Sequence, residues 1–384
     1  MQKLFIDTPE KLQSYCETIK NSQWLALDTE FIRERSYYPK FCLLQICDGH
    51  SAACIDPLQI DSLDPILEII YNTDITKVFH AAHQDLEIFF HLWGKLPKPI
   101  FDTQLAASIT GHGDQIGYAK LVQAILNVNL AKDHSRTDWS MRPLDEHQLD
   151  YAYDDVIYLE QIYKVLHQQI QQDGRDDWLD DEYAHFNNPS TFQVEPDNAW
   201  KKVKSRQHLK GVQYAILQAL AAWREKKAIN ADRPRRWIMK DEVLVDLSKR
   251  MPGKENALAK IRGLEKTTIS KHGDTLLSLI SEAKNIPAEH WPSDKKTSRR
   301  LTAEEEALCD LMMAAIRLIA TENHITPSAI ASRKDAEKLI TGERDMVLLE
   351  GWRLKVAGEK LLKILNKSLL PGWNAEGKLI LKEI

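Results

Sequence analysis

The sequence contains few cysteines, and their spacing matches no paired-cysteine motif. Five cysteines occur among 384 residues, and no two of them form a Cys-x-x-Cys pair. Most of them lie in apolar stretches that are typical of β-strands. We therefore expect small core residues of a reduced, cytoplasmic protein rather than disulfide partners. The five are Cys16, Cys42, Cys47, Cys54 and Cys309.

Long hydrophobic runs are also missing. No apolar stretch approaches the ~20 residues that a membrane-spanning helix needs. The segment from Met1 to Asp7 lacks the basic stretch and apolar run of a signal peptide. The composition, 43% hydrophobic and 28% charged, is typical of a soluble globular chain, and 384 residues suggest two or three domains. The sequence therefore predicts no membrane partner.

Positive charge is scarce in the first half of the chain and abundant in the next quarter. Residues 1–200 hold 15 Lys/Arg against 32 Asp/Glu, whereas residues 201–300 hold 24 Lys/Arg against 11 Asp/Glu. This asymmetry favours a metal-dependent enzyme joined to a separate surface for a polyanion. Two merely solvated surfaces would give the same counts, so charge alone does not choose between the two interpretations.

The strongest site pattern is Trp24-Leu-Ala-Leu-Asp-Thr-Glu-Phe31. Leu25 to Leu27 predict a short buried strand that ends at Asp28 and Glu30. Side chains two apart on a strand point the same way, so two carboxylates project together from an apolar strand end. They would repel each other unless a hard divalent cation such as Mg²⁺ bound them. An isolated Asp-x-Glu is more often an ordinary polar strand end, so a metal site needs further acids.

Further acids occur where predicted strands and helices meet. Asp85 opens a helix that follows a short strand over Lys77 to His80, and open α/β sheets place their sites at such strand ends. Taken alone, Asp85 could equally be a helix-start acid that complements the helix dipole. Asp102 has the same ambiguity, and there we expect a helix N-cap.

A long helix is predicted from about Leu144 to Gln171, and it carries Tyr151 and Asp155. These two residues are four apart and share one helix face. A structural tyrosine above a surface acid is the simpler explanation of this pair when it is considered by itself.

The predicted elements indicate an α/β fold. Strands are expected over Leu4 to Ile6, Phe41 to Cys47 and Ala52 to Ile55, the last two joined by a hairpin turn at Asp48-Gly49. Units of strand, helix and strand follow. We therefore expect a mixed β-sheet flanked by helices.

Together these residues resemble the DEDD family of 3′→5′ exonucleases, which has a ribonuclease H-like fold. The matching acids are Asp28, Glu30, Asp85 and Asp155. Tyr151-x-x-x-Asp155 is similar to the family's tyrosine-bearing subclass. The sister subclass carries a histidine five residues before the last acid, where this chain has Asp150, so the histidine version is excluded.

Within that family the chain resembles the ribonuclease D branch most closely. The stretches that carry the resemblance cover most of residues 20–165: Leu27-Asp-Thr-Glu-Phe31, Tyr37-Tyr-Pro39, His80-Ala-Ala-His-Gln-Asp-Leu-Glu-Ile-Phe89, Phe101-Asp-Thr103, Ser135-Arg-Thr-Asp-Trp139, Arg142-Pro-Leu144 and Gln148-Leu-Asp-Tyr-Ala152. Proofreading relatives usually carry Asn shortly before the second-motif Asp, where this chain has Ala82-His83-Gln84. His83 and Gln84 are therefore candidate substrate contacts.

The resemblance implies a 3′→5′ exoribonuclease that uses two divalent metal ions, Mg²⁺ or Mn²⁺, to release 5′-nucleotides. Its expected substrates are tRNA precursors and other small stable RNAs. Asp28 would bridge both ions, Glu30 and Asp155 would complete the site of the ion that activates water, Asp85 would support the second ion, and Tyr151 would orient the attacking water.

Two alternatives stay open. The first is a DNA 3′→5′ exonuclease, because the metal site does not distinguish ribose from deoxyribose. A contact to the 2′-OH would decide between RNA and DNA as the substrate. A catalytically inactive RNA-binding adaptor is the second, and the presence of all five site residues argues against it.

The rest of the chain has a different pattern. A linker composition around Phe186 to Asp197 separates the exonuclease domain, predicted over 1–190, from a region that we expect to be entirely helical. Two weakly similar units in that region, 205–290 and 298–384, resemble the HRDC module, a small helical nucleic-acid-binding domain. The first unit is the more convincing, and a basic linker from Trp291 to Arg300 joins them. The expected fold class is thus a ribonuclease H-like α/β domain followed by two all-α domains.

Several residues are candidate RNA contacts. Phe31 could stack on a terminal base, although a core role is equally compatible. Arg233, Arg235 and Arg236 cluster around a Pro-bearing turn, with Trp237 available to stack on a base or sugar. A buried Trp237 among solvated arginines would fit the same pattern. No obligate protein partner is implied, and we expect a monomer.

Overall fold

The computed structural model describes residues 1–384 except 131–136, 185, 187, 294–298 and 384. Ser135 and Arg136 of the resemblance motifs, and the predicted start of the last domain at 298, lie outside the described residues. The chain divides into two compact units. Unit 1 comprises Met1–Phe31, Phe41–Phe192 and Thr297–Ile384, and unit 2 comprises Ile32–Lys40 and Gln193–Lys296. Among the described helices, none is long and apolar enough to cross a membrane.

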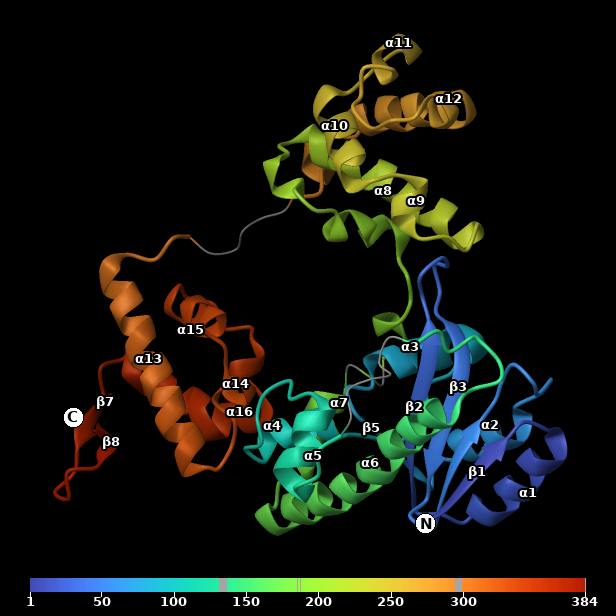
Figure 1. Ribbon diagram of the computed structural model, residues 1–384. Helices are drawn as coiled ribbons and strands as arrows, with labels where there is room; N and C mark the ends of the chain where they lie inside the picture. The colour runs from blue at the N-terminus through green and yellow to red at the C-terminus, as the bar shows by residue number, and fades with distance from the viewer. Residues whose placement is uncertain (131–136, 185, 187, 294–298, 384) are drawn as a thin grey trace. The chain divides into compact units, whose positions relative to one another are not determined.

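Unit 1 is built on a six-stranded mixed sheet (Figure 1). Its strands are β1 (Gln2–Ile6), β2 (Trp24–Ile32), β3 (Lys40–Cys47), β4 (Ser51–Ile55), β5 (Thr76–Phe79) and β6 (Ile100–Asp102), in the order β1-β4-β3-β2-β5-β6. β3 runs antiparallel to β4, β1 is parallel to β4, and β5 is parallel to both β2 and β6. The predicted mixed sheet is confirmed.

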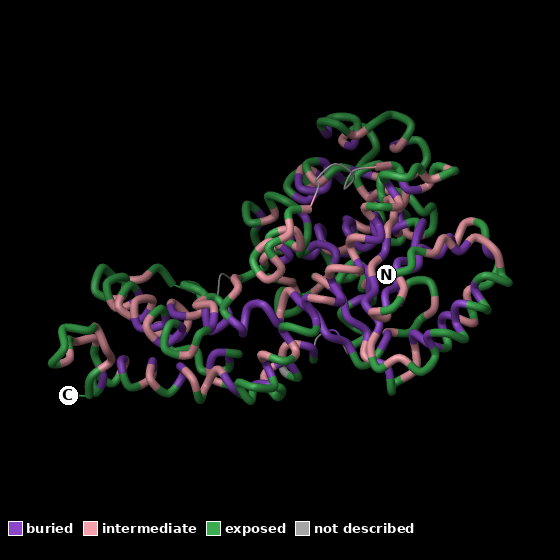
Figure 2. The backbone as a smooth tube through the Cα atoms, turned by 60° about the horizontal axis from the view of Figure 1, so that its bottom comes forward, coloured by how far each residue is buried: buried purple, intermediate pink, exposed green. Residues whose placement is uncertain are grey.

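The core of unit 1 includes β3, β4 and β5, which are buried after their first residues, and Figure 2 colours buried residues purple. Every residue of β3 after Lys40 is buried, because this apolar strand has neighbours on both sides and is covered on both faces. All five cysteines are free and buried, as predicted from the apolar stretches around them.

The helices of the same domain flank the sheet. They are α1 (Pro9–Ile19), α2 (Asp64–Ile70), α3 (His83–Trp93), α4 (Thr103–Ile109), α5 (Tyr118–Leu126), α6 (Glu146–Asp173) and α7 (Asp176–Tyr183). α6 packs against β4 and β5 and against α4 and α5. Asp102 is the N-cap of α4, as predicted, and its carboxylate also accepts hydrogen bonds from the backbone N–H groups of Ala81 and Ala82, which lead into α3.

The start of α6 is fixed by a buried ion pair. The Arg142 guanidinium binds both carboxylate oxygens of Asp56, which follows β4, at 2.5 and 2.7 Å. It also donates to the backbone carbonyl of Trp139. Asp145 then begins the helix with a capping box formed with Gln148. These contacts hold the first turns of α6 against the sheet.

One strand is longer than the sequence predicted. The expected strand ended at Leu27, whereas β2 continues to Ile32, so Asp28 and Glu30 lie within a strand rather than after one. The prediction failed because a charged side chain was taken as the end of an apolar run. In the register with β5, the last pair is Ala26 with Val78, so the two acids lie beyond the paired part of that edge.

Unit 2 is a helical domain centred on α8 (Val212–Asn230), followed by α9 (Arg235–Ile238), α10 (Asp241–Arg250), α11 (Glu255–Leu258) and α12 (Lys266–Lys284). α10 and α12 pack against α8 through fully buried leucines, among them Leu217, Leu220, Leu244 and Leu276. The buried Arg224 of α8 donates to the Asp241 carboxylate at 2.6 Å and to the Met239 carbonyl, which fixes the corner between α9 and α10.

The last part of the chain belongs to unit 1. Its helices are α13 (Ala303–Glu322), α14 (Pro327–Ile330), α15 (Arg333–Ile340), α16 (Gly351–Arg353) and α17 (Glu359–Leu365), with a π-helical turn at Leu354–Gly358. They pack on α4 and α7. Trp178 stacks on Trp352 with ring centroids 4.3 Å apart, and Arg175 donates to the backbone carbonyl of Asn323 at 2.6 Å.

The expectation of a wholly helical region after the linker is wrong at its end. Strands β7 (Leu369–Trp373) and β8 (Leu379–Glu383) form an antiparallel pair. Asn374 accepts the backbone N–H groups of Glu376 and Lys378, and Gly377 has a positive φ of 74°, so an Asn/Gly turn joins two short apolar segments. The predicted α/β exonuclease domain and the largely helical region after it are confirmed, and the division of that region into two modules stays a prediction.

Candidate active site

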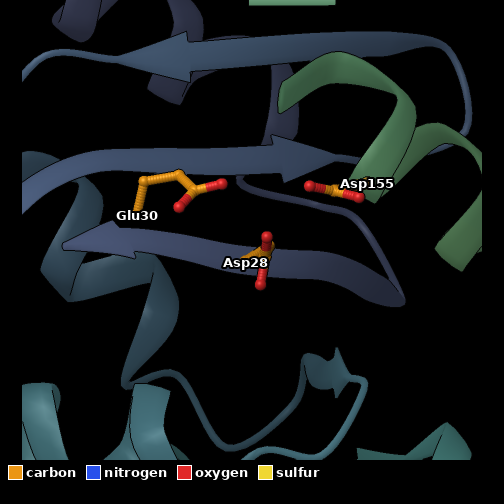
Figure 3. A group of neighbouring side chains, drawn as sticks. All are labelled: Asp28, Glu30 and Asp155. Atoms are coloured by element: carbon orange, nitrogen blue, oxygen red, sulfur yellow. The ribbon is translucent and has the colours of Figure 1, made fainter. Parts of the chain in front are cut away.

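Three acidic side chains from two elements meet at one point. Asp28 and Glu30 come from β2, and Asp155 comes from α6; one carboxylate oxygen of each lies within 4.8 Å of the others. In Figure 3 the carboxylate of Asp155 points from the helix toward the two acids on the strand. Asp28 and Glu30 share a side of β2 because strand side chains alternate, and the packing of α6 brings Asp155 to them.

The environment of this cluster opposes its ionisation. Burial and the negative charge of Asp155 hold the pKa of Asp28 well above its ordinary value. Burial and the charges of Asp28 and Asp155 raise the pKa of Glu30, and burial with the charge of Asp154 raises the pKa of Asp155. In the described part of the chain, no lysine or arginine is among the main causes of these three pKa shifts. The cluster combines mutual repulsion with a full set of hard oxygen donors.

The fourth acid lies apart from the three. Asp85, buried in the first turn of α3, is held by Thr29, whose hydroxyl donates to Asp85 Oδ1 at 2.5 Å. Thr29 stands between Asp28 and Glu30 on β2, so its side chain points to the opposite side of the strand. Burial and the charge of Asp28 still raise the pKa of Asp85. Thr29 has no functional signature in the sequence, because its partner is 56 residues away.

The phenol of Tyr151 is tied to this cluster. It donates a hydrogen bond to the carboxylate of Asp155, one turn further along α6. Burial and the charges of Asp155, Glu30 and Asp28 raise the pKa of Tyr151 above its ordinary value, so the phenol keeps its proton at neutral pH. The Tyr151 phenol can therefore donate a hydrogen bond and orient a water molecule, but it is a poor proton acceptor.

A second phenol, which no sequence pattern indicated, fixes the backbone at Asp155. Tyr118, at the start of α5, donates to the backbone carbonyls of Asp155 at 2.6 Å and Asp154 at 3.0 Å. Its ring lies 5.4 Å from the ring of His80, whose Nδ1 is 3.0 Å from Thr103 Oγ1. No local sequence pattern connects Tyr118 with a helix that begins 28 residues later.

The predicted RNA contacts in unit 1 lie in different environments. His83 and Gln84 are exposed at the beginning of α3, and the His83 ring lies 5.2 Å from the Phe192 ring. Phe31 is partly buried on β2, immediately after Glu30.

The predicted RNA contacts in unit 2 also differ from one another. Arg233, Arg236 and Trp237 are exposed, and 59% of the Trp237 surface is accessible, so the alternative of a buried Trp237 is wrong. Arg235 is different, because it forms an ion pair with the buried Glu225 at 3.5 Å. Arg235 therefore has a structural contact that the sequence did not predict.

Comparison with known proteins identifies the family. The family described as 3'-5' exonuclease matches residues 4–171, and the HRDC domain matches residues 213–280. The ribonuclease D of Bartonella henselae is 38% identical over 388 residues, which cover 100% of this chain and 95% of that protein. This chain belongs to the ribonuclease D family.

Further ribonuclease D proteins agree. The one from Sphingobium indicum is 38% identical over 95% of each chain. The crystal structure of Escherichia coli RNase D, described as an exoribonuclease involved in structured RNA processing, matches with a TM-score of 0.81 and 33% identity over 96% of this chain and 99% of that chain. Like its family, this ribonuclease D is a 3′→5′ exoribonuclease, and hence a hydrolase, as the sequence predicted. Its exonuclease domain uses divalent metal, and the carboxylate cluster is consistent with that.

Proposed function

We propose that the cluster of Asp28, Glu30 and Asp155 is the catalytic centre, where two divalent ions, Mg²⁺ or Mn²⁺, support hydrolysis at RNA 3′ ends. The observation that carries this proposal is the meeting of three carboxylates, whose oxygens lie within 4.8 Å of one another. The donor set fits the ions, because closely spaced carboxylate oxygens are the ligands that hard divalent cations prefer. A bound cation would also offset the burial and repulsion that raise the three pKa values.

When bound, the ions would supply Lewis-acid activation of water and stabilisation of the leaving 3′-oxygen. Asp28, whose charge raises the pKa values of both Glu30 and Asp85, is proposed to hold both ions. Glu30 and Asp155 would hold the ion on the water side. Asp85 would support the other ion, directly or through water, with its carboxylate oriented by Thr29. Tyr151, protonated and bonded to Asp155, would orient the attacking water.

The proposed substrates are tRNA precursors and other small structured RNAs, processed in the cytoplasm by a monomer. The Escherichia coli relative is involved in structured RNA processing, which supports a structured RNA as the substrate of this chain. The excess of Lys/Arg in residues 201–300 supports a second RNA contact outside the acidic catalytic domain. His83 and Gln84 are proposed to contact the terminal nucleotides, Phe31 to stack on the last base, and Arg233, Arg236 and Trp237 to hold the body of the RNA.

One experiment tests the proposed activity and its alternatives. End-labelled RNA and DNA of the same sequence, each with a free or a phosphorylated 3′ end, are incubated with the enzyme in Mg²⁺, Mn²⁺ or EDTA. The proposal expects stepwise release of 5′-nucleotides from RNA with a free 3′-OH, and only with a divalent ion present. Equal or faster degradation of DNA would contradict the RNA assignment, and no degradation with either ion would contradict the catalytic centre.

A further inference from the structure

A short loop of the exonuclease sequence folds with the helical domain. Residues Ile32–Lys40 connect β2 to β3 of the catalytic sheet, yet they group with residues 193–296 in unit 2. The loop contains Tyr37-Tyr38-Pro39, a motif that carried the family resemblance but has no part in the acid cluster. The contacts of this motif assign it a role.

Four side chains fix the loop to α8 and to the turn before α9. The carboxylate of Asp232 accepts the backbone N–H groups of Tyr37 at 2.9 Å and Tyr38 at 3.2 Å. The Tyr37 phenol, which is buried, donates to the buried carboxylate of Glu225. Arg235 completes the set, since its guanidinium forms an ion pair with Glu225 and lies 5.8 Å from the centre of the Tyr37 ring. We call Tyr37, Glu225, Asp232 and Arg235 the tyrosine anchor.

The tyrosine anchor engages two acids on the N-terminal side of the basic turn, and Asp241 and Glu242 follow the turn. Glu225 is paired with Tyr37 and Arg235, and Asp232 is engaged by two backbone N–H groups. Burial and the contact with Glu225 raise the pKa of Tyr37, so the phenol stays protonated and keeps donating. The buried Glu225 carboxylate is therefore directed into the anchor, and the exposed Asp232 carboxylate accepts two of the loop's N–H groups.

Exposed cations lie on both sides of this anchor. The loop contributes Arg33, Arg35 and Lys40, with Glu34 as its single acid, and the α9 turn contributes Arg233, Arg236 and Lys240. Trp237 follows Arg236 and exposes 59% of its surface. Exposed cations and an exposed aromatic ring on segments that one set of contacts joins are typical of a surface that binds phosphates and stacks on a base.

We propose that loop 32–40 and the turn 233–240 form one RNA-binding surface, which holds the RNA upstream of the 3′ end by its phosphates, with a base on Trp237. This inference rests on the proposed function and adds the loop, which no comparison assigns to RNA binding. Chain connectivity links the surface to the acids: Arg33 follows Glu30 by three residues, so at most about 11 Å separates their Cα atoms.

The test uses the full-length enzyme and an RNA hairpin with a single-stranded 3′ tail. Binding is measured by fluorescence anisotropy in EDTA over a range of KCl concentrations, so that no outcome depends on catalysis. The variants are Arg35→Gln from the loop, Arg236→Gln from the turn, and the double variant. Lys260→Gln, an exposed cation elsewhere in unit 2, is the matched control for charge. Circular dichroism confirms that each variant folds.

Arg35→Gln and Arg236→Gln should each weaken binding several-fold and reduce the slope of log K against log[KCl] by roughly one, and the double variant by roughly two. Lys260→Gln should leave the slope unchanged. Unchanged binding by Arg35→Gln would remove the loop from the surface and overturn the inference. Equal losses for Lys260→Gln would also overturn it, because they would indicate only general attraction by net charge.

Cleavage of a trinucleotide in Mg²⁺ separates this inference from the proposed function. The trinucleotide is too short to need an upstream surface, so Arg35→Gln and Arg236→Gln should lose more activity on the hairpin than on the trinucleotide, whereas Lys260→Gln should cleave both at the wild-type rate. Equal losses on both substrates by Arg35→Gln would place its effect in the active site and contradict the inference. A wild-type enzyme that binds the hairpin but cleaves neither substrate would contradict the proposed function and leave the binding result standing.

Discussion

Thr29 and Asp85 are joined by a hydrogen bond of 2.5 Å from the threonine hydroxyl to carboxylate Oδ1, across 56 residues of sequence. β2 therefore supports acids on both of its sides. Asp28 and Glu30 project toward Asp155, while Thr29 between them fixes the fourth acid of the site. A single strand thus positions three of the four carboxylates of the proposed centre.

Thr29→Val should lower kcat on a short RNA about 10–100-fold, the usual cost of losing a partner that orients a metal ligand. Thr29→Ser keeps the hydroxyl and should retain most of the activity. Steady-state kinetics with a Mg²⁺ titration would measure both variants. Equal losses in Thr29→Ser, which keeps the hydroxyl, and Thr29→Val, which lacks it, would show that the hydrogen bond to Asp85 is not what supports activity.

Asp28→Asn should reduce hydrolysis to below a few per cent of wild type, because a neutral amide oxygen is a weak ligand at the position proposed to hold both ions. The fold should be unaffected, since the substitution also removes one of three repelling carboxylates. Asp150→Asn is the matched control: Asp150 is an exposed residue of α6 that pairs with Lys3 at 2.8 Å. The proposal fails if Asp28→Asn keeps substantial activity under saturating Mg²⁺.

Tyr151→Phe should slow hydrolysis while changing the Mg²⁺ requirement little, because the phenol is assigned to water and not to metal. Tyr153→Phe, two residues along the same helix and outside the cluster, serves as the control. Measuring the hydrolysis rate as a function of Mg²⁺ concentration gives the maximal rate and the Mg²⁺ requirement of each variant. A variant with an unchanged maximal rate but a much higher Mg²⁺ requirement would show that Tyr151 acts on metal binding instead.

The metal-free enzyme should lose stability as the pH rises. The pKa values of Asp28, Glu30 and Asp155 in the native state are raised above their ordinary values of 3.8 and 4.5 by burial and mutual repulsion. The native state therefore binds these protons more tightly than the unfolded state. The contribution of these three groups to stability is largest below their ordinary pKa values and is lost as the pH rises from those values to the raised ones.

Thermal melting in EDTA between about pH 5 and pH 8 measures this effect. The Tm of wild type should fall more steeply with pH than that of Asp28→Asn, which has one fewer buried acid. Mg²⁺ should reduce the difference, because a bound ion takes the place of the protons, and its affinity should rise with pH. Parallel melting curves for the two proteins in EDTA would argue against a buried, protonated cluster.

Arg235→Gln and Arg236→Gln should differ in their effect on stability. Arg235 pairs with the buried Glu225, so its loss leaves a buried carboxylate with fewer partners and should cost about 1–3 kcal/mol of the free energy of unfolding. Arg236 is exposed and should change stability little while weakening RNA binding. Urea unfolding measures both variants. Equal destabilisation would mean that Arg236 also supports the fold.

The sequence by itself determined the features that depend on near neighbours in the chain. Alternation along a strand placed Asp28 and Glu30 on one side, and the helix repeat placed Tyr151 and Asp155 on one face. The N-cap at Asp102, the buried cysteines and the mixed sheet followed from equally local patterns. The family resemblance supplied the order of the acids, which local chemistry alone does not.

Only the tertiary structure decided which distant groups share a contact. Asp155 reaches the two strand acids because α6 packs on the sheet, Thr29 meets Asp85, and Tyr118 holds the backbone of Asp155. Tyr37 contacts Asp232 across 195 residues, and this contact holds a loop of the catalytic sheet in the helical unit. Arg235 forms an ion pair with Glu225 in the same unit. These contacts arise from packing between elements, and no spacing within one element encodes them.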